Sequence, residues 1–162
     1  MTDFARLMSD YFVKYLAGQK GSGSNTMKTY RDTFVQLLEF MDEKKHIRAD
    51  CIEVDSFSYD IINEFLEYLE KEKRVSISTR NNRLAAIRSF FKYTGYHEPK
   101  YLNISTSIRE ISKKKTEGRQ MNYLSVNAME HFLNSFDKTD HKELRCFCIV
   151  LLLYESGARV TE

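Results

Sequence analysis

The scarcity of turn residues is the feature that most constrains the fold, since 162 residues contain one proline and six glycines. An all-β chain would need a turn about every ten residues, and glycine and proline supply many such turns. Apolar residues instead recur at helical spacing, as Phe4, Leu7 and Tyr11 do in the first segment. A hydrophobic content of 42% is enough for a packed core. We therefore expect an all-α protein, a helical bundle of four to five helices followed by a further helical part.

Local signals place the expected helices along the chain. We expect four helices at about 3–17, 24–45, 58–74 and 78–95, and two more at about 125–136 and 141–156. Ser78 and Ser125 are the expected N-caps of the fourth and fifth of these, and Asp140 with Glu143 is the expected capping pair of the last.

A polar segment divides the chain. Residues 113–120 read KKKTEGRQ, with no apolar side chain and one glycine, which is typical of a linker. We therefore expect a first domain at 1–112, a linker at 113–120 and a second part at 121–162.

The small net charge of +2 hides a strongly basic middle region. Residues 1–70 hold 8 basic and 13 acidic side chains, whereas residues 71–119 hold 13 basic and 4 acidic ones. Residues 120–162 hold 4 basic and 6 acidic side chains. A basic region of this kind indicates a surface that faces a polyanion, although a merely solvated helix face would also be basic.

The expected fourth helix carries side chains of the types that contact phosphates and base edges, and residues 75–97 contain no acid. An α-helix fits the major groove of DNA, so this helix is the predicted DNA reader. An ordinary polar helix face remains the alternative. With two cations on the second helix, the predicted DNA-binding residues are Lys28, Arg31, Thr79, Arg80, Asn82, Arg83, Ser89 and Lys92.

An apolar run from Cys146 to Tyr154 leads into Gly157 and then Arg159 and Glu162. Such an apolar helix is expected to be buried, with its cysteines as small core residues. An arginine after a buried helix could bind a phosphate through its two-pronged guanidinium, although a surface arginine is the alternative. The cysteines and histidines show no ligand-like spacing, so no metal site is predicted.

Four motifs in this order resemble the tyrosine recombinase (phage integrase) family. The segment from Thr26 to Arg31 looks like the second helix of that family's SAM-like core-binding domain, and Thr79 to Tyr93 looks like its fourth helix. Tyr123-Leu124-Ser125 resembles the opening of the catalytic domain, and residues 157–162 match the first catalytic box.

The resemblance implies DNA strand cleavage through a 3′-phosphotyrosyl intermediate, without a metal or other cofactor. Arg159 matches the first catalytic arginine, and Glu162 matches the acid that supports it. Double-stranded DNA is the implied partner, together with other recombinase protomers in a tetrameric synapse. The family's Lys, His-x-x-Arg and nucleophilic Tyr would lie beyond Glu162, so we expect a fragment that is inactive by itself.

Two other functions remain open from the residues alone: a non-enzymatic helical DNA-binding regulator, and a helical protein-interaction module. The apolar run at 146–154 also raises the prospect of a dimer or of a domain swap across the linker. It falls short of the roughly 20 residues that a membrane-spanning helix needs, and no signal peptide is evident. We therefore expect a cytoplasmic protein with no membrane partner.

Overall fold

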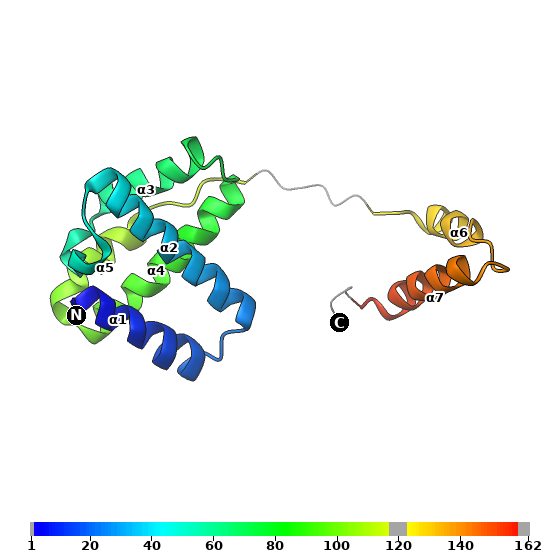
Figure 1. Ribbon diagram of the computed structural model, residues 1–162, viewed down its shortest axis with the longest axis horizontal. Coiled ribbons are helices and arrows are strands. Elements are labelled where there is room, and N and C mark those ends of the chain that lie inside the picture. The colour runs from blue at the N-terminus through cyan, green and yellow to red at the C-terminus, as the bar shows by residue number, and fades with distance from the viewer. Residues whose placement is uncertain (1, 117–122, 159–162) are drawn as a thin grey trace. The chain divides into compact units, whose positions relative to one another are not determined.

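The computed structural model describes residues 2–116 and 123–158, and the chain divides into two compact units, residues 1–117 and 118–162. The described residues are helical and contain no strand, which confirms the all-α prediction (Figure 1). The elements are α1 (Asp3–Asp10), the π-helix η1 (Tyr11–Gln19), α2 (Ser24–Lys45), the 3-10 turns η2 (Ala49–Cys51) and η3 (Val54–Ser56), α3 (Tyr59–Lys71), α4 (Ile77–His97), the 3-10 turn η4 (Pro99–Tyr101), α5 (Leu102–Glu110), α6 (Val126–Asn134) and α7 (His141–Ser156).

The first expected helix is two elements. Thr2 caps α1 by accepting a hydrogen bond from the Ala5 backbone at 3.3 Å. The chain then continues from Tyr11 as a π-helix, whose turns are wider than those of an α-helix. The apolar spacing alone could not separate these two helix types, because Tyr11 and Tyr15 share a face in both.

The long helices lie close to their predicted positions, with shifted ends. Ser76, and not Ser78, caps α4, because its hydroxyl accepts from the Thr79 backbone at 3.2 Å. At the other end, α4 continues through Gly95 to His97. The end of α2 is set by His46, which adopts a left-handed conformation with φ of 56°.

The core of the first unit is rich in aromatic rings and centres on Phe90 of α4. The Phe90 ring lies 5.5 Å from Phe4 of α1, 5.4 Å from Tyr11 of η1 and 5.3 Å from Phe34 of α2, measured between centroids. All four side chains are at most 4% exposed. Because α4 also contacts α3 and α5, it is the central helix of this unit (Figure 1).

A close approach joins α4 to α5. A Cβ atom at Gly95 would lie 2.7 Å from the Ser105 Cβ atom, so only glycine fits there without a shift. Beyond α5, residues 109–114, here called the strap, hydrogen-bond to side chains of α4. The strap is the stretch through which the first unit leads on to the second.

The second unit contains α6 and α7. Ser125 caps α6 as predicted, through a 3.2 Å bond from the Ala128 backbone. Asp140 caps α7, but Glu143 accepts from the Asp137 backbone at 2.6 Å and does not complete the expected capping pair.

The structure contradicts the expected burial of α7. Ile149 and Leu152 are 48% and 68% exposed, and Cys146 and Cys148 are exposed as well. Among the described residues of this unit, α6 is the one helix beside α7, with Phe136 and Phe147 in ring contact at 6.2 Å. A single neighbouring helix covers one flank of α7 and leaves the rest of its apolar surface uncovered.

Candidate nucleic-acid interface

A basic groove runs beside α4 and unites side chains from four parts of the first unit. It has a volume of about 450 Å³, and none of the described residues that line it is acidic. Its five cations come from η1, α4, α5 and the strap, and they are Lys20, Arg88, Lys92, Arg109 and Lys113. Tyr15, Tyr30 and Ser89 add hydroxyl groups. We call this site the α4 groove.

The α4 groove contains two of the predicted DNA-binding residues, Ser89 and Lys92. Lys92 is exposed, and its ammonium lies 5.8 Å from the centre of the Tyr96 ring. Ser89 is half-buried and lies against the hydroxyl of the fully buried Tyr11. Burial raises the pKa of the Tyr11 phenol well above its usual value, and Ser89 partly opposes that shift. Tyr11 is therefore a neutral hydroxyl beneath the floor of the groove.

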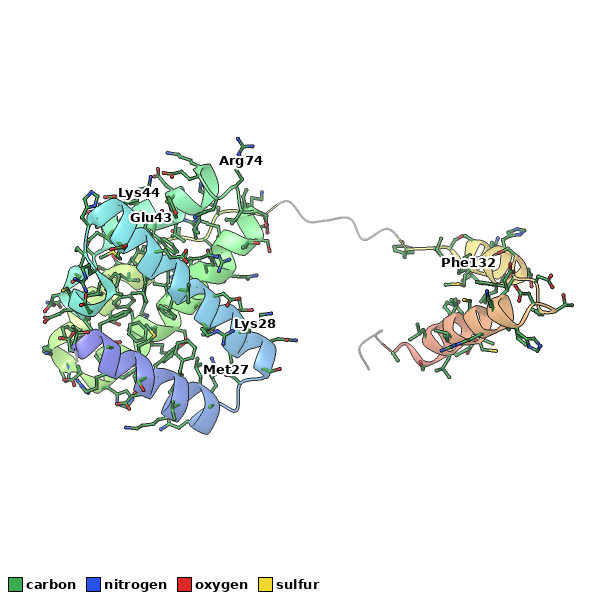
Figure 2. All side chains as sticks on the ribbon, viewed as in Figure 1. Met27, Lys28, Glu43, Lys44, Arg74 and Phe132 are labelled. Carbon is green, nitrogen blue, oxygen red and sulfur yellow. The ribbon has the colours of Figure 1, made fainter. Side chains whose placement is uncertain are left out.

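A second hollow lies at the start of α2 and contains Lys28 and Arg31. Its volume is about 430 Å³, and Phe12 and Met27 supply apolar surface beside these cations. Met27 and Lys28 lie at the N-terminal end of α2, near the end of η1 (Figure 2). Backbone N–H groups at a helix N-terminus favour anions, so both cations stand in a region of positive potential.

Two predicted residues on α4 have partly structural surroundings. Arg83 is half-buried, with one guanidinium nitrogen 3.5 Å from the Thr33 hydroxyl of α2, and burial lowers its pKa. Thr79 lies 3.0 Å from the capping Ser76, oxygen to oxygen. Asn82, in contrast, is exposed.

Arg80 points into the protein, unlike the other predicted cations. Its side chain is 6% exposed, and its Nε atom lies 3.2 Å from a carboxylate oxygen of Glu70 on α3. It also donates to the Ser112 carbonyl at 3.2 Å. The sequence placed it on the DNA-facing surface, but its charge is engaged inside the first unit. We leave it out of the interface.

The sequence-based selection missed three cations of the α4 groove: Lys20, Arg109 and Lys113. Their shared signal was the high density of Lys and Arg in residues 71–119, which includes two of them. Lys113 had been assigned to the linker. Since η1, α5 and the strap are distant in sequence, their convergence beside α4 is a tertiary feature.

The two predicted catalytic residues, Arg159 and Glu162, lie outside the described residues. The described chain ends just after α7, where Gly157 adopts a left-handed conformation with φ of 63°. Within residues 2–116 and 123–158, no group of three or more His, Cys, Asp or Glu side chains could hold a metal ion. No helix in the same ranges has the length and apolar character needed to cross a membrane.

Comparison with known proteins identifies the first unit. The family described as phage integrase, N-terminal SAM-like domain, matches residues 10–99, which include η1, α2, α3 and α4. These are the elements that provide most of the α4 groove and its supporting core.

Full-length relatives agree with that match. Tyrosine recombinase XerD of Vibrio vulnificus is 30% identical over 162 residues, which are 100% of this chain and 49% of XerD. Tyrosine recombinase XerC of Staphylococcus aureus is 26% identical over 157 residues, 96% of this chain and 49% of XerC. A protein of Sinorhizobium fredii named as a candidate integrase/recombinase, y4rC, is 27% identical over 158 residues, 98% of this chain and 48% of its own length.

The chain thus spans about half the length of the curated relatives it matches. No solved structure matches it. The family match covers more than half of the chain, and it coincides with the helical unit that carries the basic groove. The chain therefore belongs to the tyrosine recombinase (phage integrase) family, whose N-terminal SAM-like domain it contains.

Proposed function

We propose that this chain is the DNA-binding part of a site-specific tyrosine recombinase, and that the α4 groove contacts the DNA backbone. The observation that carries the proposal is the convergence of five cations, from four segments, on a groove with no acidic lining residue among those described. Cations on a neutral chain are usually interspersed with acids, so this arrangement supports a polyanionic ligand.

The chemistry of the groove fits a phosphodiester. Lysine and arginine neutralise phosphate charge, while serine and tyrosine hydroxyls donate hydrogen bonds to phosphate oxygens. Arg88 and Ser89 offer both kinds of donor from adjacent positions of α4. We further propose that Asn82, Lys28 and Arg31 extend the contact surface, Asn82 because an amide can pair with an adenine edge.

The first alternative, a non-enzymatic DNA-binding regulator, uses the same groove, so the groove does not discriminate it. The recombinase assignment is favoured because XerC and XerD bear that name and align with nearly the whole chain. The second alternative, a protein-interaction module, is disfavoured because the groove offers mainly charged and hydroxyl groups.

We also propose that residues 1–162 by themselves hold DNA without cleaving it. The resemblance assigns phosphate stabilisation to Arg159 with Glu162, and assigns the nucleophilic tyrosine to a position beyond them. A suicide substrate with a nick in the scissile region tests this, because it traps any covalent protein–DNA product. We expect no covalent product, and a phosphotyrosyl adduct formed by these residues would overturn the proposal.

The decisive test of DNA binding compares two triple variants that change the net charge equally. Lys20→Gln/Lys92→Gln/Lys113→Gln removes three cations of the α4 groove. Lys44→Gln/Lys71→Gln/Lys73→Gln is the control, in which Lys44 and Lys73 flank Tyr68 and Lys71 pairs with Glu67. Lys44 and Lys28 lie near opposite ends of α2 (Figure 2).

The measured quantity is the affinity for a duplex of random sequence at a series of salt concentrations. Each lost phosphate contact lowers the slope of log affinity against log salt by about 1, so the groove variant should lose about 3. The control should keep the slope of the unmodified protein. Equal losses in both variants would show a general charge effect and contradict the α4 groove as the interface.

A further inference from the structure

The strap contributes two cations, Arg109 and Lys113, to the α4 groove, and its main chain is tied to the side of α4 by hydrogen bonds from side chains. Asn81 donates to the Lys114 carbonyl at 2.8 Å and accepts from the Lys114 N–H at 3.1 Å. A single amide side chain thus pairs with both backbone groups of one strap residue, as a neighbouring strand would.

Arg88 holds the other end of the strap. It donates to the Ile111 carbonyl at 2.5 Å and also to the carbonyl of Arg109. Because Arg88 lines the α4 groove as well, it joins the strap directly to the proposed DNA-binding surface.

A closed ring of polar contacts reinforces the Asn81 end. Arg80 bonds to the Asn81 side-chain oxygen at 3.2 Å and lies 3.2 Å from one Glu70 oxygen. The other Glu70 oxygen accepts from the Lys114 ammonium at 2.7 Å. Glu70, Arg80, Asn81 and Lys114 therefore connect α3, α4 and the strap in one cycle, which we call the clasp.

We propose that the clasp positions Arg109 and Lys113 for DNA, so that Asn81 is a positioning residue that supports DNA binding without touching DNA. This inference rests on the proposed function of the α4 groove. Asn81 is 9% exposed and is absent from the groove lining, so its contribution passes through the strap. Without the clasp the strap retains its positive charges but no longer has a fixed place for them.

The test is Asn81→Leu, which replaces the amide with an uncharged side chain of similar size. Asn103→Ala is the control, since Asn103 is an exposed amide on α5 outside the groove. Lys114 N–H exchange should speed up in Asn81→Leu and stay unchanged in Asn103→Ala. Unchanged exchange at Lys114 in Asn81→Leu would overturn the clasp, whether or not the protein binds DNA.

The DNA readout is the salt slope, combined with a double-mutant cycle. Asn81→Leu should lower the slope by up to about 2, one for each strap cation. In the background of Arg109→Gln/Lys113→Gln it should cause no further loss, because the cations that it positions are already gone. A thermal melt confirms that each variant is folded, and Asn81→Gln, which retains the amide, should recover part of the slope.

The outcomes separate this inference from the function on which it rests. A normal salt slope in Asn81→Leu, or a loss that adds fully to that of Arg109→Gln/Lys113→Gln, overturns the positioning role while leaving the groove intact. Loss of slope in Asn81→Leu alone, with none in the Lys20/Lys92/Lys113 variant, contradicts both.

Discussion

The two units of this chain differ in how completely they cover their own apolar surface. In the first, rings from α1, η1, α2 and α4 enclose Phe90, and the core includes more than twenty buried apolar side chains. In the second, none of the described side chains is buried, and Leu152 is 68% exposed. Similar helical periodicity thus produces a closed core in one unit and an uncovered helix in the other. Periodicity reports which face is apolar, and the number of packing partners decides whether it is buried.

The largest effect expected from this difference is on core truncation. Phe90→Ala should lower the free energy of unfolding by about 3–5 kcal/mol, because it removes a ring that other rings surround. Leu152→Ala should change it by no more than about 0.5 kcal/mol. Guanidinium denaturation followed by circular dichroism measures both. A large loss in Leu152→Ala would break the comparison, and would indicate that α7 is covered by a second copy or by a swapped unit.

A smaller effect should come from the tight contact between α4 and α5. Gly95→Ala should cost about 1–3 kcal/mol, because its Cβ would lie 2.7 Å from that of Ser105. Gly18→Ala is the control, since its nearest neighbour would be a backbone oxygen at 3.6 Å. Ser105→Gly should relieve the cost when combined with Gly95→Ala. If the double variant is as unstable as the single one, close packing is not the cause.

The smallest effect concerns alkaline pH. The Tyr11 phenol ionises near pH 10 in the unfolded chain, and burial raises its pKa in the folded protein. Stability should therefore fall as pH rises above about 10, by at most about 1.4 kcal/mol per pH unit from this residue. Tyr11→Phe should remove that share of the loss, measured by denaturant unfolding between pH 9 and 11. Tyr154→Phe, at a 47% exposed tyrosine of the second unit, is the control and should retain it.

The sequence predicted the fold class and the approximate helices, because apolar spacing and polar caps are local signals. Ser125 caps α6 as its spacing indicated, whereas Ser76 and Ser78 were equally good candidates and packing selected the earlier one. The π-helical geometry of η1 and the exposure of α7 depend on neighbours that the local sequence does not specify.

For the candidate site, the sequence identified α4 but not the groove beside it. Ser89 and Lys92 line the groove as part of that helix, while Lys20 and Arg109 reach it from elements distant in sequence. Arg80 shows the opposite case, because an arginine on a basic helix has the same local pattern whether or not an acid such as Glu70 is placed to receive it.

The clasp has a consequence for how sequences of this kind can diverge. Its members come from α3, α4 and the strap, and each contacts two others. Replacing Arg80 alone would leave Glu70 with one cation, the exposed Lys114 ammonium, and replacing Glu70 alone would leave the buried Arg80 guanidinium without its carboxylate. Either single step passes through an unfavourable intermediate, so these positions should be inherited, or exchanged for apolar residues, as a group.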